Sequence, residues 1–143
     1  MKKLLFLAAT IMLGVVACSA EEKPIAFEQL PQNAKTFITE NFSNFKFLSA
    51  VVDRDDAGKD HKVFFADGSQ IEFDRKGNWK DIECKASEVP AGAIPAQITS
   101  FISENYAGRK VLEISRDRHD YEVKLNDRLE LKFDRNFNFL GFD

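Results

Sequence analysis

The chain contains an internal repeat, and this feature limits its possible folds more than any other. Residues from Leu30 onward align with residues from Ile94 onward at an offset of 64, and after a four-residue deletion in the second copy the offset becomes 60. About a third of the aligned positions are identical. The matched pairs include Pro31–Pro95, Phe37–Phe101, Asn41–Asn105, Asp53–Asp117, Val63–Val123 and Phe73–Phe133. The pattern predicts two copies of one supersecondary unit.

Each copy opens with a predicted amphipathic helix. Apolar residues recur at helical spacing over residues 30–42 and 94–106. Pro31 and Pro95 stand near the first turn, where a missing N–H group costs nothing. We expect both apolar stripes to pack in a core, which is favoured over a ligand groove.

Four strands are predicted after each helix. In the second copy, residues 121–125 and 129–133 alternate apolar and polar residues around a turn. The first copy repeats this hairpin less strictly, at 63–65 and 71–73. Further strands are expected before and after each hairpin, at 46–53, 79–84, 110–116 and 139–142. We therefore predict an α+β fold in which tandem α-β-β-β-β repeats form one antiparallel sheet body with helices on one face.

The first 20 residues have the features of a signal peptide. Lys2 and Lys3 precede an apolar stretch that is shorter than the about 20 residues needed to span a membrane. Val15-Val16-Ala17-Cys18 resembles the bacterial lipobox, so Cys18 is a candidate for lipidation, whereas cleavage after Ala20 is the alternative. We expect export to the periplasm or outer cell envelope, either lipid-anchored at Cys18 or soluble after cleavage following Ala20.

The remaining chain divides at a short linker. We predict a signal peptide at 1–20, a first repeat at 21–84, a linker at 85–93 and a second repeat at 94–143, with residues 21–24 as a solvated tether. Neither short unit would bury its sheet well alone, so the two are expected to pack as one body.

Charge and cysteine content narrow the possible partners. The chain has 23 acidic and 20 basic residues, which argues against non-specific nucleic-acid binding because that needs a basic face. Cys84 is the second of only two cysteines and is expected to be a small, partly buried residue at a strand end. We predict no intramolecular disulfide and no contact with a membrane except through a lipid on Cys18.

No catalytic motif stands out in the sequence. There is no serine elbow, glycine-rich phosphate loop or paired-cysteine motif. His61 and His119 each stand beside an aspartate, but both are more simply explained as exposed loop residues. We expect a protein that is not an enzyme and needs no cofactor.

An acidic segment resembles the start of a calcium-binding loop; its members are Asp53, Asp55, Asp56, Gly58 and Asp60. Ala57 stands at the fifth loop position and Phe64 at the twelfth, where oxygen ligands are required. A solvated acidic turn is favoured over a weak cation site, and we predict no metal site.

Several runs resemble the tail motif of PepSY-like domains, a family of small exported bacterial proteins described as beta-lactamase-inhibitor-like. The runs are residues 121–125, 131–134 and 138–140, and, as the better match, the run from Phe73 to Trp79 with Gly77 in its turn. The second copy has Phe137 where the motif has glycine. The resemblance implies a tandem helix-plus-sheet fold without known catalytic residues.

The expected function is binding of a protein or peptide in the cell envelope through the sheet face that helices leave uncovered. Two alternatives are inhibition or modulation of an envelope peptidase or beta-lactamase, and a structural role without a specific ligand. Strand alternation sends Leu48, Ala50 and Val52 inward, and Leu140 with Phe142 toward the helices. An apolar patch is then expected on the uncovered face, formed by Phe47, Val51, Phe64, Trp79 and Phe139. Charged residues form its predicted rim: Glu72, Glu122, Lys124, Glu130 and Lys132.

Overall fold

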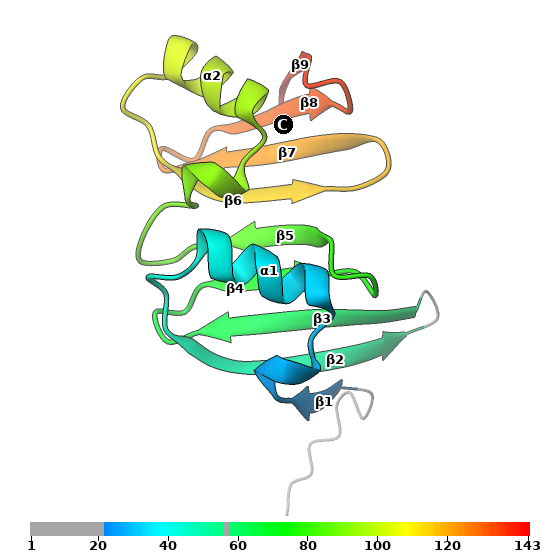
Figure 1. The fold of residues 1–143 in the computed structure, drawn as a ribbon. Coiled ribbons are helices and arrows are strands. Elements are labelled where there is room, and N and C mark those ends of the chain that lie inside the picture. The colour runs from blue at the N-terminus through cyan, green and yellow to red at the C-terminus, as the bar shows by residue number, and fades with distance from the viewer. Residues whose placement is uncertain (1–21, 56–57) are drawn as a thin grey trace, which may run out of the picture.

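A computed structural model describes residues 22–55 and 58–143, and within them the strands form one open antiparallel sheet (Figure 1). The sheet has nine strands whose spatial order is the order of the chain, so every strand pairs only with its neighbours in sequence. The strands are β1 (Glu22–Ile25), β2 (Phe47–Asp55), β3 (Gly58–Phe65), β4 (Gln70–Phe73), β5 (Trp79–Glu83), β6 (Val111–Arg116), β7 (Asp120–Leu125), β8 (Glu130–Asp134) and β9 (Phe139–Phe142). The predicted α+β class with an antiparallel sheet is confirmed.

Two helices, α1 (Gln32–Asn41) and α2 (Ala96–Asn105), lie on the same face of this sheet (Figure 1). Each is preceded by a short 3-10 turn, η1 (Phe27–Gln29) or η2 (Ala91–Ala93). Pro31 and Pro95 are the residues that precede the first helical turns, as the sequence predicts. After β1, the chain thus runs as a helix and four strands, then a second helix and four more strands.

The core lies between the helices and the sheet. Phe37 of α1 packs edge-on against Phe73 of β4, with ring centroids 5.9 Å apart. Phe101 of α2 packs in the same way against Phe133 of β8, at 5.2 Å. The largest fully buried side chains are Phe42, Phe65, Phe73, Phe133, Ile71, Ile82, Ile98, Ile114, Leu125, Leu131, Val63 and Val123. The helical stripes are therefore core, as expected, and the opposite face of the sheet has no helix among the described residues.

Four bulges interrupt the strands and reverse part of the predicted alternation. In β2 the register shifts between Phe47 and Ser49, and in β6 it shifts between Val111 and Glu113. In β5, Phe73 pairs with Trp79 while Glu72 pairs with Asp81, so one residue is extra. The same extra residue occurs in β9 at Leu140. A bulge turns the side chains before it to the other face of the sheet, so strict alternation fails at each of these points.

Two predicted orientations are wrong in the bulged strands, and a third residue is more exposed than expected. Leu48 was expected in the core, but it is 63% exposed because it occupies the bulge of β2. Leu140 and Phe142 were expected to be covered by the helices, yet both are exposed, at 57% and 60%. Leu140 occupies the bulge of β9. Phe142 lies on the helix side, opposite Leu131 and in contact with Phe139, but it stays largely exposed because it belongs to the last strand of the sheet.

The N-terminal segment is a strand rather than the predicted tether. Residues Glu22 to Ile25 pair with residues Asp53 to Ala50 of β2. This pairing covers one edge of β2 and brings Glu22 to Lys62. Sequence alternation is too short here to reveal a strand, since only four residues are involved. The signal peptide, Cys18 and the cleavage positions lie outside the described residues.

The two β-turns at Gly77 and Phe137 have the same conformation despite their different residues. Gly77 has φ +88° and Phe137 has φ +67°. Each turn closes with matching hydrogen bonds, from Gly77 N to Asp74 O and from Phe137 N to Asp134 O, both 3.0 Å. A side chain in this left-handed region is costly, and the Phe137 ring compensates by packing on Tyr121 at 5.3 Å.

Candidate functional site

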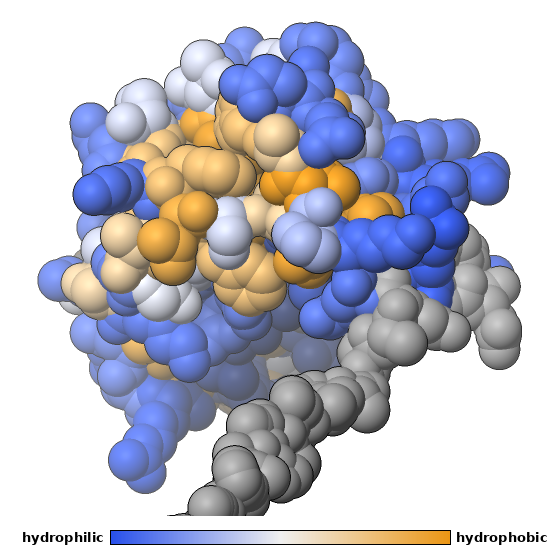
Figure 2. Space-filling model, turned by 90° about the horizontal axis from the view of Figure 1, so that it is seen from below, coloured by the Kyte–Doolittle hydropathy of each residue, from blue (hydrophilic) through white to orange (hydrophobic). Residues whose placement is uncertain are grey.

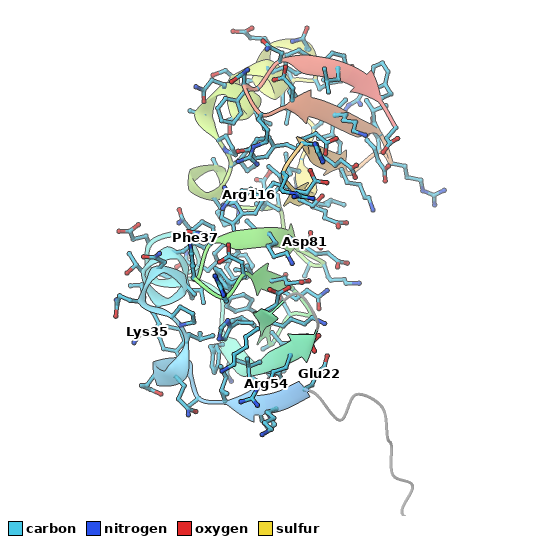
Figure 3. The ribbon with its side chains drawn as sticks, turned by 90° about the vertical axis from the view of Figure 1, so that its right-hand side faces the viewer. Glu22, Lys35, Phe37, Arg54, Asp81 and Arg116 are labelled. Carbon is cyan, nitrogen blue, oxygen red and sulfur yellow. The ribbon has the colours of Figure 1, made fainter. Side chains whose placement is uncertain are left out.

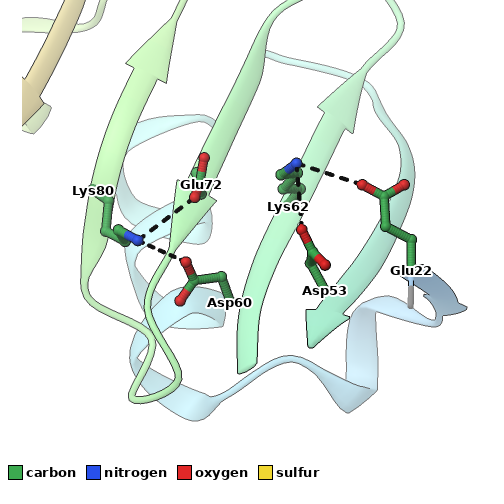
Figure 4. Close-up of polar contacts among 6 residues, drawn as sticks. All are labelled: Glu22, Asp53, Asp60, Lys62, Glu72 and Lys80. Carbon is green, nitrogen blue, oxygen red and sulfur yellow. Dashed lines mark hydrogen bonds and ion pairs between the residues drawn. The ribbon is translucent and has the colours of Figure 1, made fainter. Parts of the chain in front are cut away.

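The sheet face opposite the helices, here called the open face, is a lattice of lysines and carboxylates. In the first half, Lys62 Nζ lies 3.5 Å from Glu22 Oε1 and 3.8 Å from Asp53 Oδ2 (Figure 4). Lys80 Nζ lies 2.6 Å from Asp60 Oδ2 and 3.7 Å from Glu72 Oε1. Each of these two lysines therefore forms ion pairs with two carboxylates.

The second half repeats this arrangement with other residues. Lys124 Nζ lies 3.2 Å from Glu113 Oε2 and 3.4 Å from Glu130 Oε1. Lys132 Nζ likewise lies 3.4 Å from Asp120 Oδ2 and 3.9 Å from Glu122 Oε1. Hydrogen bonds to their carboxylates raise the pKa values of Lys80, Lys124 and Lys132. Such exposed pairs contribute little stability, but they leave the open face with a clear excess of negative charge.

Three carboxylates, those of Asp81, Glu83 and Glu113, lie together where β5 meets β6, the junction of the two halves. Glu83 is paired with Lys85, and Glu113 with Lys124. Glu83 lies directly opposite Glu113 across this strand pair, although like charges in that position repel. Asp81 lies beside them, on the side of the sheet away from Phe37 and the helices (Figure 3). Burial, followed by the charge and hydrogen bond of Glu113, raises the pKa of Asp81 to about 7. Its Oδ1 atom is buried and has no hydrogen-bond partner among the described residues.

A small pocket of about 170 Å³ lies next to Asp81 on the open face. Its walls carry the carboxylates of Asp81 and Glu72 and the aromatic ring of Phe64, and its other lining residues are Lys62, Gln70 and Ile71. An apolar ring beside two carboxylates suits a side chain with an apolar stem and a cationic end.

The predicted binding residues divide between the two faces of the sheet. Val51, Phe64 and Lys124 lie on the open face, because their strand neighbours Val52, Val63 and Val123 are buried in the core. Phe64 and Val51 are half-buried and Lys124 is exposed.

The expected orientation is wrong for the other three aromatic residues, which lie on the helix side. Phe47 packs on Phe27 of η1, with ring centroids 5.4 Å apart. Trp79 is only 7% exposed, and Phe139 stacks on Phe101 of α2 at 4.8 Å. Bulges after Phe47, Trp79 and Phe139 reverse the face to which each points. The predicted aromatic patch therefore does not exist on the open face.

An apolar patch does occur at the β1 end of the molecule (Figure 2). At this end Leu48 is largely exposed, and Ile25, Phe27 and Phe47 are partly buried against the core. Phe47 thus contributes to an apolar surface at the edge of the sheet rather than on the open face.

The two histidines differ in exposure, and Cys84 is buried. His61 was expected in an exposed loop, but it is 9% exposed because it lies within β3 on the helix side. His119 is exposed in the β6–β7 connection, as expected. Cys84 is buried just after β5, and its burial raises the pKa of the thiol to about 11, which disfavours a reactive thiolate.

The described residues of the acidic segment belong to β2 and β3, which pair with each other. Asp53 lies opposite Asp60, and their carboxylates are paired with Lys62 and Lys80. Asp56 and Ala57 lie outside the described residues. Within residues 22–55 and 58–143, no group of three or more His, Cys, Asp or Glu side chains is arranged to hold a metal ion.

The pocket beside Asp81 was not found by sequence reasoning. A partial signal was present, because Asp81, Glu83 and Glu113 are charged residues within the strands that the sequence predicts at 79–84 and 110–116. The pairing of β5 with β6 was needed to bring these carboxylates together.

In the part of the chain that the structure describes, no helix is both long and apolar enough to cross a membrane.

Solved structures from Bacteroides resemble this fold closely. A protein of Bacteroides thetaiotaomicron described as a "putative calcium-regulated periplasmic protein" has 46% sequence identity and a TM-score of 0.82, covering 85% of this chain and 96% of its own. A "putative periplasmic protein" of Bacteroides vulgatus has 42% identity and a TM-score of 0.83, covering 88% and 99%. A second protein of Bacteroides vulgatus, of unknown function, has 33% identity and a TM-score of 0.79, covering 85% and 98%.

These descriptions support a periplasmic location and indicate no catalytic family. No curated protein matches the chain. Residues 59–141 match the family described as "Putative beta-lactamase-inhibitor-like, PepSY-like". These residues include most of β3, all elements from β4 to β8, most of β9 and both of the turns that carry the tail motif. The chain belongs to the PepSY-like family.

Proposed function

We propose that the protein is a non-catalytic binding module of the cell envelope whose open face recognises a basic segment of a protein or peptide. The observation that carries this proposal is the uncompensated carboxylate of Asp81. Its Oδ1 atom has no partner among the described residues, and its proton affinity is raised by burial and by the neighbouring carboxylates. A cationic side chain from a partner would supply the missing charge.

The pocket beside Asp81 specifies how such a side chain would bind. A lysine or arginine stem would pack on the ring of Phe64, and its charged end would reach Asp81 and Glu72. The surrounding lattice adds long-range attraction, because each of its lysines is shared between two carboxylates. We also interpret the two halves as a tandem repeat, so that this pocket forms beside the junction of the repeats.

The proposal predicts charge-selective peptide binding. A fluorescently labelled oligolysine peptide is expected to bind the full chain, whereas an oligoglutamate peptide of equal length is not. Asp81→Asn should weaken oligolysine binding about tenfold, because it removes one charge-assisted hydrogen bond. Binding should strengthen as the pH rises through 7, because Asp81 then becomes ionised. Fluorescence anisotropy at constant ionic strength measures both effects.

Glu130→Gln is the matched control, since it removes one negative charge from the same face but lies beside Lys124 and not beside the pocket. It is expected to change the affinity less than about twofold. Equal losses in the two variants, or equal binding of the two peptides, would contradict a specific pocket. Ca²⁺ belongs in the titration as a competitor, because the Bacteroides thetaiotaomicron relative is described as calcium-regulated.

A further inference from the structure

A second, oppositely charged site lies at the junction of the two halves. It is a cleft of about 740 Å³ formed by the β4–β5 turn of the first half and by the β6–β7 connection and Arg135 of the second. Arg116 lies at this junction in Figure 3. The residues that line the cleft are Asp74, Asn78, Trp79, Lys80, Arg116, Asp117, Arg118, His119 and Arg135.

The cleft is basic although the protein as a whole is acidic. Three arginines line it, and within residues 22–55 and 58–143 none of the three lies within ion-pair distance of a carboxylate. Lys80 is already paired with Asp60 and Glu72 on the open face. The guanidinium groups of Arg116, Arg118 and Arg135 are therefore the available cations.

The two carboxylates of the cleft are engaged in holding its loops. Asp117 Oδ1 accepts hydrogen bonds from the backbone N–H groups of His119, at 2.7 Å, and Asp120, at 3.0 Å, which lower its pKa. Asp74 Oδ1 accepts from the N–H groups of Lys76 and Asn78. These carboxylates shape the turns, and neither of them forms an ion pair with Arg116, Arg118 or Arg135.

Aromatic rings hold two of the arginines in place. The Arg116 guanidinium stacks on Trp79, 4.1 Å from the ring centroid, while its Nε donates to the Trp79 carbonyl at 2.7 Å. The Arg135 guanidinium lies 4.9 Å from the Tyr121 ring centroid and donates one hydrogen bond to the Asp117 carbonyl. Each guanidinium keeps further N–H donors, and a stacked arginine loses little entropy when it binds an anion.

We propose that this cleft binds a small phosphorylated molecule. Arginine donors match phosphate oxygens in pairs, and three arginines exceed what a single carboxylate requires. The volume of the cleft, about 740 Å³, lies within the range of ordinary small-molecule binding sites. The cleft needs both halves of the chain, so a ligand bound there contacts each of them.

Inorganic pyrophosphate is the probe, and Trp79 is the reporter, because it is the only tryptophan in the chain and lies under Arg116. Pyrophosphate is expected to change the tryptophan fluorescence saturably at constant ionic strength. The double variant R118Q/R135Q should weaken this binding at least about tenfold, and R118Q alone at least about threefold. R118Q removes an exposed side chain, so it tests the proposal without endangering the fold.

The repeat supplies matched controls. Arg54 and Arg75 align with Arg118 and Arg135 but do not line the cleft, so R54Q/R75Q is expected to bind pyrophosphate as the unaltered chain does. Equal weakening in both double variants would show general charge screening and overturn the proposal. A non-saturable response, or tighter binding of citrate than of pyrophosphate, would also overturn it. Failure here leaves the oligolysine experiment unaffected, because the two sites have opposite charge.

Discussion

Replacing Gly77 with alanine is expected to destabilise the protein by about 3 kcal/mol, through two independent costs. Gly77 has φ +88°, which an alanine adopts only with strain. A Cβ atom at this position would also lie 2.8 Å from the backbone nitrogen of Ala34 and 2.9 Å from Cβ of Pro31. These atoms belong to the start of α1, which cannot move away without losing its packing on the sheet. Thermal or urea unfolding measures the loss.

Gly108→Ala separates the two costs. Gly108 has a similar φ of +83°, but a Cβ atom there would meet no atom within 4 Å. Its substitution should cost only about 1 kcal/mol, the conformational part alone. If the two variants were equally stable, the close approach of α1 to the β4–β5 turn would not restrict residue 77.

Replacing Asp81 with asparagine is expected to stabilise the protein by roughly 2 kcal/mol above pH 7. The folded state raises the pKa of Asp81 to about 7, so folding favours its protonated form. The stability of the unaltered chain should therefore decrease as the pH rises from about 4 to 7 and then level off. An asparagine at this position carries no charge, so this part of the pH dependence should disappear. Urea unfolding measured at a series of pH values from about 5 to 8 tests both statements.

Asp53→Asn provides the comparison on the same face. Asp53 shares Lys62 with Glu22, and its loss should change the free energy of unfolding by less than about 1 kcal/mol. A decrease in stability for Asp81→Asn at about pH 8 would contradict the repulsion between Asp81 and Glu113. It would also remove the basis for a missing cation at the pocket.

The periodicity of the sequence was sufficient to predict the helices and eight of the nine strands. The stripes that end at Phe42 and Tyr106 place the two helices, and Pro31 and Pro95 mark where they begin. These signals are local, because each depends on side chains within one helix or one hairpin. β1 was missed because its four residues alternate too briefly, and its partner β2 begins at Phe47, well beyond η1 and α1 in the chain.

The bulges had a signal that strict alternation overlooks. Each bulged strand places its helix-facing apolar residues three positions apart instead of two: Phe47 and Ala50, Trp79 and Ile82, Val111 and Ile114, Phe139 and Phe142. An odd spacing puts both residues on one face only if an extra residue lies between them. This spacing, taken with the aligned positions of the bulges in the two halves, would have placed Trp79 and Phe139 on the helix side.

The candidate sites were less predictable than the elements. Val51, Phe64 and Lys124 follow from alternation, but the close approach of Asp81 and Glu83 to Glu113 depends on which strand of the second half lies next to β5. The basic cleft likewise joins Trp79 to Arg116, which are 37 residues apart. Neither juxtaposition is encoded in a local pattern, since both arise from the pairing of the two halves.

The strand order of the sheet also determines how the chain can fold. Because each strand pairs only with its neighbours in sequence, no strand must wait for a distant segment to be inserted beside it. Most loop closures are short hairpins, and the two longer ones each contain a helix that shortens the effective chain. Contacts of low sequence separation favour rapid folding. During synthesis the N-terminal strands become available first. The sheet can therefore grow one strand at a time, because each new strand pairs with an edge that is already formed.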